Sequence, residues 1–137
     1  MVATNPMIPM PVKARPYDHQ YKAFDFACEK FGLVPSASRS NGVALLMEMG
    51  TGKTLTSIAI LGALYQFGLI RRALVVCPVS IKGVWEQEIA KFAAFPCNVT
   101  VLTGASKPNA NVSLVTAVPS TSIPVSLHPR RQAVRKR

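Results

Sequence analysis

The sequence predicts an α/β fold in which helices cover a parallel β-sheet. Three short apolar runs, at residues 43–47, 73–77 and 99–103, alternate with helix-length patterns. Strands that alternate with helices are joined by right-handed crossovers and therefore run parallel. A glycine-rich stretch, residues 50–52, separates the first apolar run from the helix that follows it. A loop in that position, ahead of a helix N-terminus, is suited to bind phosphate.

The chain begins with a proline-rich stretch, residues 1–14, which we expect to be an extended leader. A helical pattern then starts at Tyr17, because apolar residues recur at the three-to-four-residue spacing of one helix face. That face consists of Tyr17, Tyr21, Phe24, Cys28 and Phe31. Gly32 suits the end of this helix, and Pro35 with the serines after it predicts a loop.

The middle of the chain supplies the remaining elements. Residues 43–47 and 73–77 read as buried strands, and the nearly all-apolar stretch 55–67 between them reads as an interior helix that Gly68 ends. A second connecting helix follows Pro78. Its apolar face consists of Ile81, Val84, Trp85, Ile89 and Phe92. Residues 99–103 would form a third strand, closed by Gly104.

The composition changes in the last part of the chain. No acidic residue follows Glu88, whereas basic residues continue to Arg137. From residue 106 the sequence is rich in Ser, Pro, Asn, Thr and Val, so we expect 106–137 to be a basic, mostly disordered tail. Residues 112–118 could form a strand by composition alone.

Charge and cysteine content narrow the class of protein. The chain has 16 Lys and Arg against 6 Asp and Glu, a net charge of +10. Such an excess favours an anionic partner, most often nucleic acid and sometimes a membrane surface, although a basic tail need have no specific partner. The 3 cysteines lack the spacing of a zinc site, which predicts reduced thiols in a cytoplasmic protein. No segment resembles a secretory signal or reaches the length of a membrane span.

The most informative segment is the phosphate-loop candidate made of Gly50, Thr51, Gly52, Lys53 and Thr54. Backbone N–H groups of such a loop form a concavity for phosphate oxygens, and glycine allows the ligand to approach closely. Lys53 would reach the β and γ phosphates of ATP, and the Thr54 hydroxyl would bind Mg²⁺. Met47 stands where the strict pattern has its first glycine, so a chance match in a surface turn is the alternative.

Residues 46–54 resemble motif I of the Swi/Snf-type ATPases, members of helicase superfamily 2 (DEAD/DEAH-box-like). That family typically has Ala-Asp-Glu-Met-Gly-Leu-Gly-Lys-Thr there, so Leu46, Met47 and Thr51 are departures. Upstream, Arg15, Tyr17 and Gln20 resemble the family's adenine-recognition motif. The resemblance implies that the Gln20 amide contacts the adenine edge; the alternative is a solvated helix residue.

A third block, residues 74–81 followed by Trp85 and Glu86, resembles motif Ia, which lies along the nucleic-acid backbone in this family. Ser80 and Lys82 are the phosphate contacts that the resemblance implies. Lys82 could equally be a solvated charge, and we assign Trp85 to the core rather than to base stacking because it lies on the apolar face.

The resemblance covers residues 15–105 and implies the N-terminal part of a RecA-like P-loop lobe that uses ATP and Mg²⁺ and acts on duplex DNA. The family also needs Asp-Glu-x-His after a later strand, and the sequence has no acidic residue after Glu88. We therefore expect a truncated or frameshifted portion of a helicase-like translocase, inactive without the missing lobe or a partner subunit. A native short paralogue is the alternative.

Two other functions remain open from the sequence. The chain could be a non-catalytic module that binds nucleotide or nucleic acid. It could also be a P-loop kinase, which ranks last because the blocks around Gln20 and Ser80 would then be coincidence.

Overall fold

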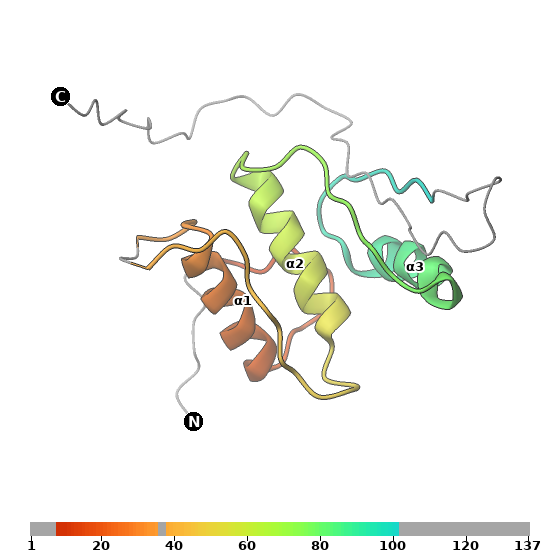
Figure 1. Cartoon of the computed structure of the whole chain (residues 1–137), viewed down its shortest axis with the longest axis horizontal. Helices are drawn as coiled ribbons and strands as arrows, with labels where there is room; N and C mark the ends of the chain where they lie inside the picture. The colour runs from red at the N-terminus through yellow and green to blue at the C-terminus, as the bar shows by residue number, and fades with distance from the viewer. Residues whose placement is uncertain (1–7, 36–37, 102–137) are drawn as a thin grey trace.

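The computed structural model describes residues 8–35 and 38–101 of the chain. Its elements, in order, are α1 (Asp18–Lys30), α2 (Lys53–Gln66), the short 3-10 helix η1 (Val79–Ile81) and α3 (Lys82–Phe92). Helix α2 lies between α1 and α3 and contacts both (Figure 1). The segment that the sequence predicts to be a basic tail, 106–137, lies outside the described residues, as does the first half of the leader, residues 1–7.

Helix α1 confirms the first predicted helix. Phe24 and Cys28 are fully buried on the face toward α2, as their spacing indicates. Tyr17 does not join that face, because it is the extended N-cap residue and its side chain is 71% exposed. At the other end, the backbone N–H of Gly32 donates to the carbonyl of Glu29 and ends the helix.

Helix α2 confirms the predicted interior helix and begins earlier than predicted, at Lys53 rather than residue 55. Its N-cap is Gly52, and Gly68 follows its end with φ of 70°. The helix is buried on almost every side, as an all-apolar sequence requires. Its buried residues are Leu55, Thr56, Ile58, Ala59, Ile60, Gly62, Ala63, Leu64 and Tyr65.

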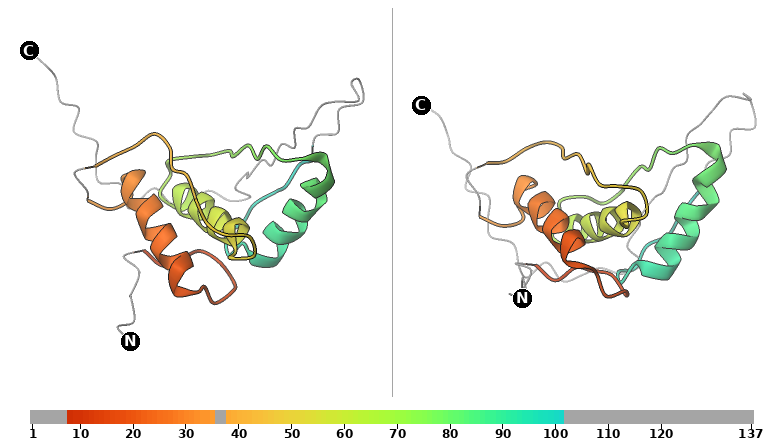
Figure 2. Two further views of the ribbon diagram at one scale, coloured as in Figure 1. Left: turned by 60° about the horizontal axis from the view of Figure 1, so that its bottom comes forward. Right: turned by 90° about the horizontal axis from the view of Figure 1, so that it is seen from below.

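Helix α3 confirms the second connecting helix, but only part of its predicted face is covered. Ile89 is buried against α2, and Trp85 is half-buried. Ile81 and Val84 are 41% and 49% exposed. The reason is geometric, because the N-terminal end of α3 leans away from α2 (Figure 2).

The predicted parallel sheet is not formed within the described residues, whose named elements are all helices. Residues 43–47, 73–77 and 97–101 are extended, yet none is a strand of a sheet; the single β-bridge there is antiparallel and joins Val12 to Ala93. Parallel strands need a neighbour about 4.8 Å away to accept and donate their hydrogen bonds. No backbone hydrogen bond of the described residues joins these segments to one another.

The extended segments nevertheless show the alternation of strands with one covered face. In 73–77, Val75 and Cys77 face the helices, whereas Leu74 and Val76 are 57% and 66% exposed. In 43–47, Leu46 is 97% exposed, while Leu45 packs on the core. A period of two residues is what a pleated strand produces. The segments therefore have strand geometry without strand pairing.

A groove of about 450 Å³ separates the two segments. Both run along the same side of α2, which forms the floor of the groove (Figure 2). Its lining residues include Val43, Leu45, Ile60, Leu64, Val75 and Trp85. Apolar surface left open in this way is the expected result when a sheet lacks some of its strands.

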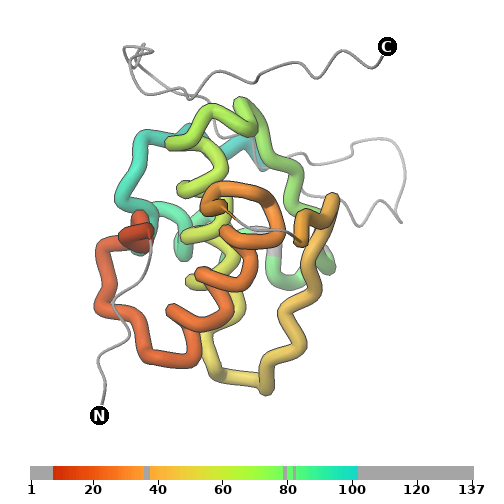
Figure 3. Tube along the Cα trace, turned by 90° about the vertical axis from the view of Figure 1, so that its left-hand side faces the viewer, coloured from red at the N-terminus to blue at the C-terminus, as the bar shows by residue number. Residues whose placement is uncertain are grey.

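The described part of the leader, residues 8–14, packs against the end of α3. The backbone N–H of Lys13 donates to Phe92 O at 2.8 Å, and Ala94 N donates to Pro11 O at 3.1 Å. Figure 3 shows this first part of the chain beside the residues that follow α3. Ile8 is buried in the core between α1 and α2. Within the ranges that the structure describes, no helix is both long and apolar enough to cross a membrane.

Candidate nucleotide-binding site

The loop between residues 47 and 53 turns sharply onto the N-terminus of α2. Gly50 and Gly52 have φ of 80° and 85°, a left-handed conformation that costs other residues energy. Gly52 is the N-cap of α2, so the first N–H groups of the helix open toward the loop. Open N–H groups at the positive end of a helix dipole are suited to bind an anion.

Lys53 holds this loop in shape through its side chain. Its ammonium donates to Met47 O at 2.8 Å and to Glu48 O at 2.7 Å. The Thr51 hydroxyl also donates to Glu48 O, at 2.7 Å. An incoming phosphate would replace these carbonyls as the partner of a cation that is already held at the loop.

Gln20 joins α1 to the same loop. It is 3% exposed; its Oε1 accepts from Tyr17 N at 3.0 Å, and its Nε2 donates to Thr51 O at 3.0 Å. These partners fix which end of the amide is oxygen, because the Tyr17 N–H can only donate and the Thr51 carbonyl can only accept. One N–H and one lone pair of the amide remain for a ligand. The predicted adenine contact is compatible with this arrangement and stays a prediction.

His19 is a loop contact that the sequence did not reveal. Its Nε2 lies 2.9 Å from Thr51 O, so this nitrogen must carry the hydrogen. Its ring stacks on Tyr17, with centroids 5.8 Å apart and planes 12° from parallel. His19 precedes Thr51 by 32 positions, and no local pattern signals a contact at that separation.

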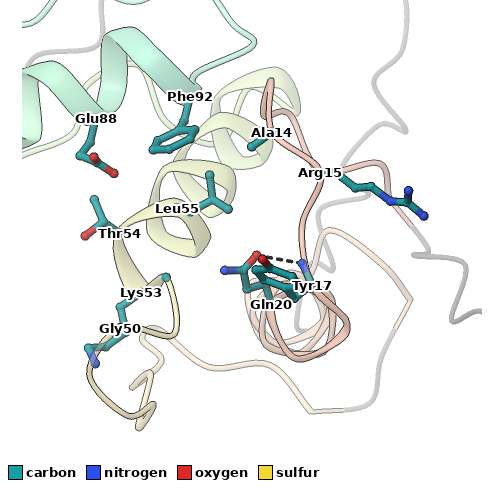
Figure 4. Close-up of a pocket in the computed structure, with 11 residues that line it drawn as sticks. Ala14, Arg15, Tyr17, Gln20, Gly50, Lys53, Thr54, Leu55, Glu88 and Phe92 are labelled. Atoms are coloured by element: carbon teal, nitrogen blue, oxygen red, sulfur yellow. Dashed lines mark hydrogen bonds between the residues drawn. The ribbon is translucent and has the colours of Figure 1, made fainter.

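Gln20 and Lys53 line one cleft of about 520 Å³ (Figure 4). It is lined by Ala14, Arg15, Tyr17, Gln20, Gly50, Gly52, Lys53, Thr54, Leu55, Glu88 and Phe92. The structure thus brings the predicted phosphate loop and the predicted adenine motif to a single cleft. Arg15 borders it with an exposed side chain whose guanidinium points away from Thr54 (Figure 4). Glu88 and Phe92, from α3, were not among the predicted site residues.

A family model described as the SNF2-related domain matches residues 19–132. The chain belongs to this family. The resemblance found in the sequence is thereby confirmed, and the chain is a member of a helicase-like ATPase family. The match runs past residue 105, where the sequence placed the end of the lobe, and reaches into 106–137.

Curated relatives agree with this membership. Protein CHROMATIN REMODELING 25 of Arabidopsis thaliana is 39% identical over 83 residues, which are 57% of this chain and 9% of the relative. CHD3-type chromatin-remodeling factor PICKLE of the same plant is 40% identical over 75 residues, 55% of this chain and 5% of the relative. DNA repair and recombination protein RAD54 of Oryza sativa subsp. japonica is 39% identical over 83 residues, which are 57% of this chain and 8% of the relative. The chain therefore spans less than a tenth of these SNF2-family relatives, and no solved structure matches it significantly.

The predicted nucleic-acid contacts of this SNF2-family chain lie apart from the cleft. Ser80 is exposed in η1, and Lys82 is the first residue of α3. Ser80 does not line the nucleotide cleft. Both belong to the turn at the free, outward-leaning end of α3 (Figure 2), where N-terminal amides of a helix are open to solvent.

Proposed function

We propose that this SNF2-family chain binds ATP together with Mg²⁺ in the cleft between α1 and the N-terminus of α2. The observation that carries the proposal is that Gln20 and Lys53 line one cleft and are joined through the backbone of the phosphate loop. An amide suited to recognise a base and a phosphate-binding loop in one cleft fit a nucleotide better than they fit an isolated anion.

The residues present fit both ligands. A Cβ placed at Gly50 would meet no atom within 4 Å, so the space beside this glycine of the loop is open. Lys53 and the N-terminal amides of α2 would hold the phosphates, and the Thr54 hydroxyl would offer Mg²⁺ one ligand. Mg²⁺ would neutralise charge on the phosphate oxygens.

The second part of the proposal is that the chain as given holds ATP without hydrolysing it. Hydrolysis in this family needs a second acidic motif for the metal and for the attacking water, and the sequence has no acidic residue after Glu88. The chain would then be the ATP-binding N-terminal portion of a DNA-dependent translocase. A non-catalytic nucleotide- or nucleic-acid-binding module is the alternative, supported by the same missing motif.

Duplex DNA is the proposed macromolecular partner. The net charge of +10 favours a polyanion, and relatives are named as chromatin-remodelling and DNA-repair proteins. Ser80 and Lys82 would contact the phosphate backbone, so binding should be indifferent to sequence and should weaken steeply with salt.

Titration with fluorescently labelled ATP tests the nucleotide proposal. Lys53→Ala removes a charged donor and should weaken binding by roughly 1.5–3 kcal/mol, about tenfold to a hundredfold. Lys22→Ala removes an exposed lysine of α1 that does not line the cleft and should bind as the wild type does. Equal affinities of the wild type and Lys53→Ala would remove the assignment.

Phosphate release from purified protein, with and without duplex DNA, tests the absence of turnover. We expect release at the background level of Lys53→Ala. DNA-stimulated release that Lys53→Ala abolishes would show that the chain is catalytically complete.

A further inference from the structure

Glu88 is a cleft residue to which neither the phosphate loop nor the adenine motif gives a role. It lies on α3, is half-buried and lines the same cleft as Lys53 and Thr54. Figure 4 shows its side chain reaching from α3 toward Thr54, across from the Gln20 end of the cleft. A carboxylate therefore faces the end of the cleft where the phosphates of a nucleotide would lie.

The Glu88 carboxylate has no ion-pair or hydrogen-bond partner among the described residues. Lys53 does not pair with it, because the Lys53 ammonium donates to the carbonyls of Met47 and Glu48. Glu88 thus brings to the cleft a negative charge that no described side chain pairs with directly, and the sign of that charge influences what can bind beside it.

A bare triphosphate beside this carboxylate would be repelled. Two like charges several ångströms apart in a partly buried site change affinity by roughly an order of magnitude. A divalent cation between the carboxylate and the triphosphate turns this repulsion into attraction, because the cation is attracted by both anions. Mg²⁺ is usually held by one or two protein oxygens together with substrate phosphates and keeps several waters. No group of three or more acidic, His or Cys side chains gathers to hold a metal within the described ranges, so the cation would arrive with the phosphates.

We propose that Glu88, with Thr54, makes nucleotide binding by this chain dependent on Mg²⁺. The carboxylate would attract the metal, directly or through a metal-bound water, and would disfavour metal-free nucleotide. This inference rests on the proposed binding of ATP. It adds Glu88 of α3 as an acidic residue on the side of the cleft where the metal would lie. Glu88 acts on binding, and no hydrolytic step is assigned to it.

The test compares affinities for fluorescently labelled ATP in excess Mg²⁺ and in EDTA. The wild type should bind more tightly with Mg²⁺. Glu88→Gln keeps the size of the side chain and removes its charge, so affinity in EDTA should rise severalfold while affinity in Mg²⁺ falls. The ratio of the two dissociation constants should then shrink about tenfold. Glu86→Gln, an exposed carboxylate of the same helix outside the cleft, is the matched control and should keep the wild-type ratio.

The outcomes separate the two proposals. If Glu88→Gln weakens binding equally in Mg²⁺ and EDTA, or leaves both unchanged, Glu88 has no metal-linked role and the inference is overturned. If the wild type and Lys53→Ala bind ATP equally, the proposed function itself fails. Glu88→Asp keeps the charge on a shorter side chain; it should retain the weak binding in EDTA and lose part of the gain from Mg²⁺. A ratio for Glu88→Asp as small as that for Glu88→Gln would show that side-chain length, not charge, governs the effect.

Discussion

The loop at the N-terminal end of helix α2 and the extended segments along its flank differ in how their backbone groups are hydrogen-bonded. At its N-terminal end, side chains pair the loop carbonyls: Lys53 contacts two of them, and His19 and Gln20 share the carbonyl of Thr51. Along its flank, residues 43–47 and 73–77 are extended without ladder partners among the described residues. The phosphate loop thus obtains its side-chain partners from its own residues and from α1, whereas the sheet requires strands that these segments do not supply to each other.

The largest expected effect on the free energy of unfolding distinguishes the packed helices from the extended segment that bears Leu46. Phe24→Ala removes a fully buried ring between α1 and α2 and should lower the free energy of unfolding by about 3–5 kcal/mol. Leu46→Ala removes a side chain that is 97% exposed and should change it by less than about 0.5 kcal/mol. Urea unfolding followed by helical circular dichroism measures both. Similar losses in the two variants would mean that the face bearing Leu46 is covered.

A smaller effect separates the two glycines of the phosphate loop. Gly50→Ala and Gly52→Ala both place a side chain at positive φ, at a cost of roughly 1–2 kcal/mol. Only at Gly52 would the new Cβ also collide with the Gln20 amide. Gly52→Ala should therefore lower the urea midpoint more, and adding Gln20→Ala should relieve part of the difference. Equal midpoints for the two single variants would show that Gln20 does not pack on the loop.

The sequence predicted the helices well because their signals are local. Each signal determines structure only a few residues away. The signals are the apolar spacing around Phe24, Gly68 at the end of α2 and the glycine-rich loop before Lys53. The sheet was not predictable in the same way. Residues 43–47 and 73–77 have the alternation and the apolar content of strands, but pairing depends on partners elsewhere in space.

The cleft, too, combines residues that the sequence predicted with residues that it did not. Lys53 and Thr54 were predicted from the phosphate-loop motif and Gln20 from the family resemblance, and the structure brings them together. His19 and Glu88 were missed because their positions depend on how α1 and α3 pack around α2, which no short pattern encodes.

A still smaller effect is expected at His19, on the loop side. His19→Ala removes one of the two donors to Thr51 O, an exposed hydrogen bond worth about 0.5–1 kcal/mol. His19→Gln can donate in its place and should recover part of the loss. The urea midpoint, with Lys22→Ala as an exposed control on α1, measures the difference. A midpoint for His19→Ala equal to that of Lys22→Ala would show that Gln20 alone secures the loop.

The smallest effect compares a thiol in the helical core with one in the extended region. Burial, and then the Asp25 carboxylate, raise the pKa of Cys28 to about 12. Burial raises the pKa of Cys97 as well, but Lys13 opposes the shift, and Cys97 is only half-buried. Since the thiolate is the reactive form, a maleimide at pH 8 should label Cys97 before Cys28.

The same shift gives stability a pH dependence. A thiol whose folded pKa exceeds its unfolded value of 9.0 favours folding below pH 9, and this contribution is lost as pH rises toward 12. Comparing Cys28→Ala with the wild type isolates the contribution of the Cys28 thiol, because the variant lacks only the titration of that thiol. Its urea midpoint should fall less steeply between pH 9 and pH 11. Parallel pH profiles, or labelling of Cys28 as fast as Cys97, would mean that α1 opens from α2 as readily as the extended segments do, and the contrast between the two sides of α2 would disappear.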